Sequence, residues 1–185
     1  DALSARGIDK IVLMTHMQQI AIEKALAARL NDVDIIIAGG SNTLLADGND
    51  VLRAGDTAID TYPLSFAGPD GSPTLVVNVD GDYKYLGRLV VDFDEAGVLL
   101  TDSLDPGEDG AWASTDAIVD MLSSRGLDTE VDQTVSNVQA ALQDVLAEQD
   151  GNVQGITNVY LDGRRTQVRT EETNLGDLTA DANLF

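Results

Sequence analysis

Cysteine is absent from this chain of 185 residues, which excludes both a disulfide framework and a zinc–thiolate site. Aromatic residues make up only 4% of the chain, too few for a surface on which nucleic-acid bases stack. No apolar run approaches the roughly 18 residues that a membrane-spanning helix needs, so we expect no membrane insertion. The length and an apolar content of 43% indicate a globular chain with a buried core.

Positive charge is also scarce. The 32 acidic residues outnumber the 11 lysines and arginines, and the formal net charge is −21. Non-specific binding to polyanions depends on Lys and Arg side chains that replace counterions, so a nucleic-acid polymer and an anionic membrane surface are disfavoured as partners. The acidic surface repels itself, and salt screens that repulsion, which favours a salt-adapted, halophilic source.

The N-terminal part of the chain has the pattern of a strand, a helix and a second strand. Residues 11–14 form a short all-apolar run, typical of a strand that is covered on both faces. Ile22, Leu26 and Leu30 follow at helical spacing and predict one buried stripe. Residues 33–38 form a second apolar run. Such a unit joins parallel strands, so we expect the two runs to be adjacent and parallel.

Polar residues follow each of these two strands. His16, the only histidine, comes after the first strand, and Gly39-Gly40-Ser41-Asn42 comes after the second. Ligands of open α/β sheets bind outside the carboxyl ends of the strands, so both groups are expected at one edge. The glycine pair is consistent with a tight turn, or with the close approach of a phosphate to backbone N–H groups.

The middle of the chain predicts antiparallel strands. Residues 47–73, rich in Gly, Asp and Pro, predict a long surface excursion. Strands are expected at 75–77, 86–93 and 98–100. Residues 92–97 resemble half of a calcium loop, but they lack its Glu ligand and favour a hairpin turn. The acidic loop at 105–109 is expected to be solvated.

Helices dominate the remainder. One is expected to begin at Ser114 or Thr115 and to end at Gly126, and a second, amphipathic helix extends to about Gln149. Short strands are then expected around Asp162-Gly163, and a last helix begins near Thr173.

Four stretches together carry a resemblance to a known family. They are Leu13–Gln18, similar to Leu-Ser/Thr-His-Leu/Met-Gly; Val33–Leu45, which aligns without gaps to V-D-V-I-I-G-G-H-S-H-T-L-L; Tyr85–Leu89 with Asp92–Asp94; and Arg169–Leu178 with Asp181-Ala182. These stretches resemble the bacterial 5′-nucleotidase family, whose members join a calcineurin-like metallophosphoesterase domain to a separate C-terminal domain.

The resemblance implies an α/β fold and a domain organisation. Residues 1–105 would be the second half of a calcineurin-like α/β-sandwich metallophosphoesterase domain, residues 106–150 a helical linker, and residues 151–185 the start of an α+β C-terminal domain. The chain would then be an interior fragment. Its half-sheet would be completed by the remainder of its own polypeptide.

The resemblance also implies a site with two divalent metal ions that hydrolyses phosphate esters, with a nucleotide or another phosphate ester as the substrate. His16 matches the histidine of the first loop. Two later histidines of the family fall on Gly40 and Asn42, where an amide can still bind a hard cation and a glycine cannot. His16 and Asn42 are therefore the expected metal ligands. The family's other ligand segments are not in this chain, so the fragment alone is expected to be inactive.

Two functions stay open at this point. One is a periplasmic or extracellular phosphoric-ester hydrolase of 5′-nucleotidase type. The other is a non-catalytic binding or surface protein on a degenerate phosphoesterase scaffold, which the missing imidazole at Gly40 favours. No nucleotide-binding glycine motif of the Walker or dinucleotide type is present.

Overall fold

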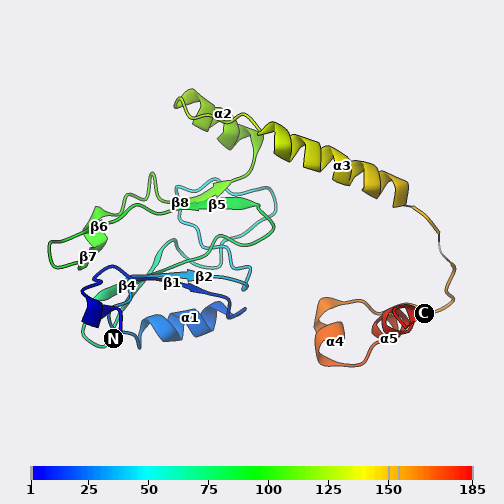
Figure 1. Ribbon diagram of the computed structural model, residues 1–185, viewed down its shortest axis with the longest axis horizontal. Helices are drawn as coiled ribbons and strands as arrows, with labels where there is room; N and C mark the ends of the chain where they lie inside the picture. The colour runs from blue at the N-terminus through cyan, green and yellow to red at the C-terminus, as the bar shows by residue number, and fades with distance from the viewer. Residues whose placement is uncertain (1, 150, 154, 185) are drawn as a thin grey trace. The chain divides into compact units, whose positions relative to one another are not determined.

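The computed structural model describes residues 2–149, 151–153 and 155–184. It divides into two compact units, residues 1–129 and residues 130–185 (Figure 1). We call them the first and the second unit. The domain boundaries expected near residues 105 and 150 stay predictions.

A four-stranded sheet forms the centre of the first unit (Figure 1). Its strands are β1 (Val12–Thr15), β2 (Ile35–Ala38), β3 (Leu64–Ala67) and β4 (Pro73–Val77). They lie in the order β1-β2-β4-β3, with β1, β2 and β4 parallel and β3 antiparallel to β4. Thr15 pairs with Ala38, so the adjacent parallel strands predicted from the sequence are confirmed, as is the α/β fold class.

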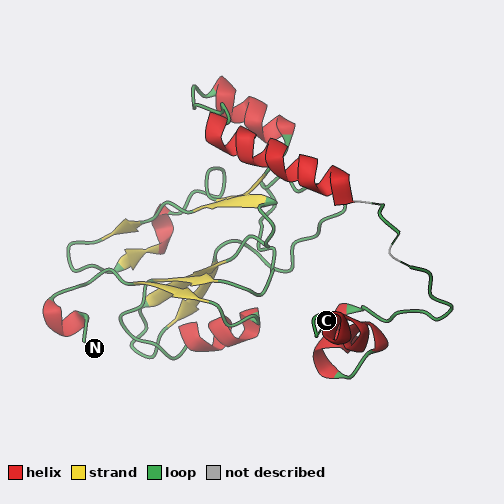
Figure 2. Ribbon diagram, turned by 45° about the vertical axis from the view of Figure 1, so that its right-hand side comes forward, coloured by secondary structure: helices red, strands yellow, loops and turns green. Residues whose placement is uncertain are grey.

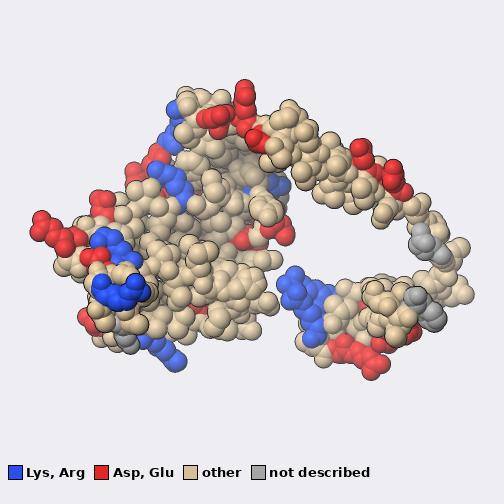
Figure 3. All heavy atoms as spheres, viewed as in Figure 1, with Lys and Arg blue, Asp and Glu red and all other residues tan. Residues whose placement is uncertain are grey.

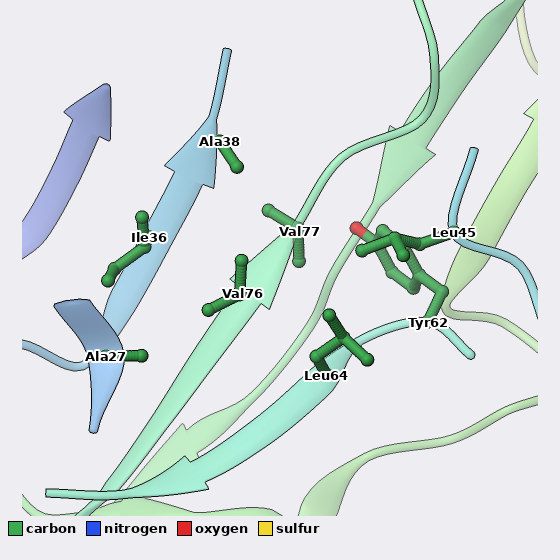
Figure 4. Packing of buried hydrophobic residues seen from close by; sticks show 8 residues of the cluster. All are labelled: Ala27, Ile36, Ala38, Leu45, Tyr62, Leu64, Val76 and Val77. Carbon is green, nitrogen blue, oxygen red and sulfur yellow. The ribbon is translucent and has the colours of Figure 1, made fainter. Parts of the chain in front are cut away.

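Helix α1 (Ile20–Ala27) lies along one face of this sheet (Figure 2). Its buried residues are Glu23 and Ala27, whereas Ile22 is 37% exposed, so the predicted stripe is wrong. Ala27 has a small side chain and lets the helix approach the strands closely, which turns the Glu23–Ala27 face inward. The apolar core combines residues of the helix, of the strands and of the loops between them (Figure 4). The buried members of this cluster are Ala27, Ile36, Ala38, Leu45, Tyr62, Leu64, Val76 and Val77.

The opposite face of the sheet stays open at β1. Val12 is 53% exposed and Met14 is 78% exposed, and Ile37 on β2 is 41% exposed. The prediction that the first strand is covered on both faces is therefore wrong for the part of the chain that the structure describes. The apolar side chains of Val12 and Met14 lie on a face of β1 that the described residues of the first unit leave largely exposed.

The segment 47–73, predicted to be a surface excursion, contributes to the core instead. Tyr62 and Leu64 are 5% and 6% exposed, and β3 pairs with β4 in this stretch. The apolar residues alternate at Tyr62, Leu64 and Phe66, which is the period of a strand, but Gly, Asp and Pro around them hide the pattern.

Four short strands complete the first unit. They are β5 (Tyr85–Arg88), β6 (Asp92–Phe93), β7 (Leu99–Leu100) and β8 (Gly110–Ala113), paired antiparallel as β5 with β8 and β6 with β7. The hairpin turn is confirmed, because Asp94 Oδ1 accepts hydrogen bonds from the N–H groups of Ala96 and Val98. Strand β8 lies inside residues 106–150, the segment that the resemblance assigns to a helical linker.

The remaining helices of the first unit are short. They are the 3₁₀ helices η1 (Ser4–Arg6) and η2 (Thr101–Ser103), and α2 (Asp116–Ser124). Thr115 precedes α2, and Gly126 follows it in the left-handed conformation with φ = +80°, as predicted.

The second unit is helical. Its elements are α3 (Gln133–Gln149), α4 (Arg165–Thr170) and α5 (Asn174–Ala182). The Thr173 side chain caps α5 by accepting a hydrogen bond from the N–H of Gly176, which confirms the predicted helix start. The strands expected around Asp162 are not found in residues 151–153 and 155–184. In this segment a side chain accepts a backbone hydrogen bond that a partner strand would otherwise accept, because the N–H of Asp162 donates to Asn174 Oδ1. None of the described helices is long and apolar enough to cross a membrane.

Candidate ligand edge

Three loops meet at the carboxyl end of the parallel strands. They follow β1, β2 and β4 and comprise residues 16–19, 39–43 and 78–83, which we call the carboxyl edge. The N–H of Gly39 donates to the Thr15 carbonyl at 3.0 Å, and the N–H of Asp80 donates to the Thr43 carbonyl at 3.0 Å. Backbone hydrogen bonds therefore join each loop to the next.

His16 lies across the two glycines of the second loop. A β-carbon built on Gly40 would lie 2.8 Å from Nε2 of the His16 ring, and one built on Gly39 would lie 3.5 Å from Nδ1. Gly40 has φ = +80°, a conformation that L side chains rarely adopt. The absence of a side chain at position 40 thus makes room for the imidazole, which is otherwise exposed.

Asn42 lies against the third loop. Its Oδ1 atom would be 2.9 Å from a β-carbon on Gly81. Asn42 itself has a positive φ of 48°. In the third loop Asp80, Asp82 and Tyr83 also have positive φ, an uncommon concentration for residues that carry a β-carbon. The second and third loops therefore approach closely because Gly81 has no side chain, and residues of both loops adopt the uncommon positive-φ conformation.

A buried amide, Asn78, holds these two loops in place. Asn78 is 8% exposed and directly follows β4. Its Nδ2 donates to the Ala38 carbonyl at 2.6 Å and to Ser41 Oγ at 2.7 Å, while its Oδ1 accepts from the N–H of Asp80 at 3.0 Å. Sequence reasoning missed Asn78, although a polar residue that directly follows a buried strand was the available signal.

A buried carboxylate lies behind the first loop. Glu23 on α1 is 0% exposed, and its Oε1 accepts a hydrogen bond from the Thr15 hydroxyl at 2.9 Å. Thr15 is the last residue of β1 and immediately precedes His16. Nothing in the sequence pointed to Glu23, because a Glu in an amphipathic helix is normally solvated.

The charges near the edge are partly paired. Lys84 Nζ lies 2.8 Å from Asp80 Oδ2, and this hydrogen bond raises the pKa of Lys84. On the face drawn in Figure 3, basic side chains lie beside acidic ones, although acids greatly outnumber bases along the chain.

The acidic loop at 105–109 is not simply solvated as predicted. Asp109 is 3% exposed, and its Oδ1 accepts a hydrogen bond from the N–H of Val90 at 2.7 Å. A backbone donor in the interior needs such a partner.

A cavity of about 530 Å³ adjoins the edge on the open face of the sheet. Its lining includes the apolar side chains of Val12, Ile37 and Leu89 and the polar side chains of Asn78 and Asp80. A mostly apolar cavity with a few polar groups is the usual form of a small-molecule site.

The two predicted site residues reach the same edge but contact different loops. His16 lies over the second loop, and Asn42 lies on the third. No hydrogen bond between them is found within the described residues, and no group of three or more His, Asp or Glu that could hold a metal ion occurs there. Their assignment as metal ligands stays a prediction.

Known proteins match the chain over nearly its whole length. The 5′-nucleotidase of Bos taurus is 29% identical over 182 residues, which are 98% of this chain and 28% of that protein. The trifunctional nucleotide phosphoesterase protein YfkN of Bacillus subtilis is 30% identical over 177 residues, 96% of this chain and 10% of that protein. No protein-family profile matches the chain.

A solved structure matches the fold. The crystal structure of the 5′-nucleotidase precursor from Thermus thermophilus superposes with a TM-score of 0.62 at 28% identity, covering 97% of this chain and 32% of that one. The chain thus has an α/β fold similar to the fold of a 5′-nucleotidase. In sequence and in fold the chain is a homologue of 5′-nucleotidases, which confirms the resemblance read from the sequence.

The residues present do not fit a two-metal centre by themselves. The chain spans about 28% of the length of the bovine relative, and the metal ligands predicted on its edge are one imidazole, His16, and one amide, Asn42. The His16 ring occupies the space next to Gly40, where a side chain at position 40 would begin. A divalent cation needs four or more ligands, which this pair does not supply.

Proposed function

We propose that the protein containing this chain hydrolyses phosphate esters of nucleotides and acts in the periplasm or outside the cell. The observation that carries the proposal is the homology to nucleotide phosphoesterases, which extends through the residues of the carboxyl edge. The reaction belongs to the whole protein, and this chain contributes one side of the site.

The chain's own part is to present His16 and Asn42. The imidazole of His16 is exposed at the end of β1, where a ring nitrogen can bind a divalent cation. The exposed amide of Asn42 offers a weaker, neutral oxygen ligand. The glycine pair lets the His16 ring lie against the backbone of the second loop.

Phosphate release from nucleoside monophosphates by the full-length protein, with added divalent cations, tests the proposal. His16→Ala should lower the rate by more than about tenfold and Asn42→Ala by less, because loss of a ligand weakens the cation site. Asn49→Ala, another exposed asparagine, is the matched control and should leave the rate unchanged. Equal rates in His16→Ala and the native protein would remove His16 from the reaction. Residues 1–185 alone should release no phosphate.

A second function is favoured by the contact between His16 and Gly40. An edge with one imidazole suits a non-catalytic binding or surface protein that keeps the phosphoesterase scaffold. Calorimetry on the full-length protein separates the two functions. Nucleotide binding without phosphate release and without binding of transition-metal ions would support the non-catalytic protein.

A further inference from the structure

The first loop of the carboxyl edge, residues 16–19, connects β1 to α1 and carries His16. A side-chain contact joins its two ends, because the Thr15 hydroxyl at the end of β1 donates a hydrogen bond of 2.9 Å to Oε1 of Glu23 in the first turn of α1. Glu23 is 0% exposed, and its Oε2 has no hydrogen-bond partner within the described residues. A buried oxygen without a partner costs stability, so packing alone does not explain a Glu at this position.

Thr15 also joins the first loop to the second. Its carbonyl accepts a hydrogen bond of 3.0 Å from the N–H of Gly39, and its hydroxyl lies 3.3 Å from the Ile37 carbonyl. The hydroxyl has one hydrogen to donate, and the shorter contact directs it to Glu23. The Thr15 carbonyl and the His16 N–H belong to the same planar peptide unit. A rotation of that unit therefore changes both the contact with Gly39 and the position of His16.

We infer that Glu23 is a positioning residue of the carboxyl edge, which holds the end of β1 through the Thr15 hydroxyl and thereby sets His16 against the second loop. The consequence for catalysis rests on the proposed function. The consequence for the two loops does not, because it follows from contacts within this chain alone.

Two variants of the full-length protein break the hydrogen bond with opposite effects on stability. Glu23→Met removes the buried carboxyl group, and the Thr15 hydroxyl can still donate to the Ile37 carbonyl, so the folding equilibrium constant should rise at least about fivefold. Thr15→Val leaves Oε1 of Glu23 without this donor and should lower the folding constant about tenfold. Glu23→Gln keeps an oxygen that accepts from Thr15 and is the conservative variant.

Amide hydrogen exchange in the metal-free protein measures how firmly the loops are joined. In both Glu23→Met and Thr15→Val the N–H of Gly39 should exchange about tenfold faster, although the first variant is more stable than the native protein and the second is less stable. Glu23→Gln should restore the native exchange. The ring signals of His16, identified by their loss in His16→Gln, should shift in the first two variants and return in Glu23→Gln.

Thr74→Val is the matched control. The Thr74 hydroxyl donates a hydrogen bond of 2.7 Å to the Val33 carbonyl, and the residue is 2% exposed. Its loss should lower the folding constant as Thr15→Val does. Thr74 lies near the amino end of β4, away from the carboxyl edge, so the exchange of Gly39 and the His16 signals should stay native. Native exchange of Gly39 in Glu23→Met, or equal acceleration in Thr74→Val, would overturn the inference.

Phosphate release from nucleoside monophosphates tests the consequence for catalysis. Glu23→Met and Thr15→Val should each lower the rate about tenfold, and Glu23→Gln should recover most of it. The double variant should be no slower than the single variants, because both break the same bond. Full activity in Glu23→Met would overturn the positioning role. Absence of phosphate release from the native protein, with the exchange and ring signals as expected, would instead count against the proposed function alone.

Discussion

The Thr15 hydroxyl at the end of β1 donates a hydrogen bond of 2.9 Å to Oε1 of Glu23, a carboxylate that is completely buried under α1. The second oxygen, Oε2, has no hydrogen-bond partner within the described residues. A buried carboxylate with one hydroxyl partner costs folding free energy, because it exchanges full hydration for a single bond. This costly group lies directly behind the strand end that carries His16.

Glu23→Met should stabilise the fold by about 1–3 kcal/mol, since it removes the buried carboxylate and keeps most of the side-chain volume. The Thr15 hydroxyl keeps a partner, because it also lies 3.3 Å from the Ile37 carbonyl. Glu23→Ala should be less stable than Glu23→Met by about 2 kcal/mol or more, because a cavity remains. Urea denaturation measures both. A destabilised Glu23→Met variant would show that Oε2 has a partner such as a buried water.

The contribution of Asp34 to folding stability should change with pH in the direction opposite to that of ordinary acid denaturation. Burial raises its pKa, although its Oδ2 accepts a hydrogen bond from the N–H of Ile11 at 2.7 Å. Between the unfolded pKa and the raised folded pKa the native state binds more protons, so this group's contribution to stability falls as pH rises through that window. Asp34→Asn lacks this loss.

The stability of Asp34→Asn relative to the native protein should therefore be greater at pH 7 than at pH 3. The matched control is Asp60→Asn, because a hydrogen bond from Lys24 lowers the pKa of Asp60. Its contribution is present above the unfolded pKa and is lost as pH falls through the folded pKa, so this variant should change in the opposite direction. Urea denaturation midpoints at pH 3 and pH 7 measure the stability of both variants relative to the native protein. A change in the same direction in both variants would refute the assigned pKa shifts of Asp34 and Asp60.

The parallel part of the fold could be predicted because its signal is local. The apolar runs that became β1 and β2 flank a helix, and the connection rule then orders them in the sheet. β3 could not be read in the same way, because Pro63 and the surrounding glycines and aspartates suggest a loop. Its pairing with β4 depends on burial of Tyr62 and Leu64, which only the assembled core decides.

The candidate site was predictable in position but not in its contacts. The rule for carboxyl ends of strands places His16 and Asn42 at one edge. The contact of His16 with Gly40, however, depends on a missing side chain, and no residue pattern reveals what fills such a space. Glu23 and Asp109 were missed for the opposite reason. Charged residues are normally expected in solvent, whereas these two are buried. Glu23 accepts a hydrogen bond from the Thr15 hydroxyl, and Asp109 accepts one from the N–H of Val90.

Salt should stabilise the protein. The net charge of −21 opposes compaction, and added ions screen that repulsion more strongly as the Debye length shrinks from about 10 Å at 0.1 M to about 3 Å at 1 M. We expect the thermal midpoint to rise by several degrees between these concentrations of NaCl. KCl should act equally if screening is the cause. A midpoint that is unchanged or lower at 1 M would count against a charge-limited fold and against a salt-adapted source.

Asn78 should be among the residues of the carboxyl edge most sensitive to substitution. Asn78→Ala removes two donated hydrogen bonds and one accepted bond, and it leaves the buried carbonyl of Ala38 without this donor. We expect a loss of about 2–4 kcal/mol, because each buried group left unpaired costs about 1–3 kcal/mol. Asn78→Asp should also be destabilising, since a carboxylate cannot donate to Ala38 and lies near Asp80.

The comparison with Asn49→Ala separates this network from a general effect of losing an amide. Asn49 is exposed, and its replacement should change stability by less than about 0.5 kcal/mol. Amide hydrogen exchange gives the local readout. In Asn78→Ala the N–H of Asp80 keeps the Thr43 carbonyl but loses its second acceptor, Asn78 Oδ1, and should exchange faster than in the native protein, while the N–H of Ala96 in the β6–β7 turn should not change. If both amides accelerate together, Asn78 supports the whole unit; if only Asp80 does, Asn78 is the residue that fixes the second and third loops against each other, and the position of Asn42 depends on it.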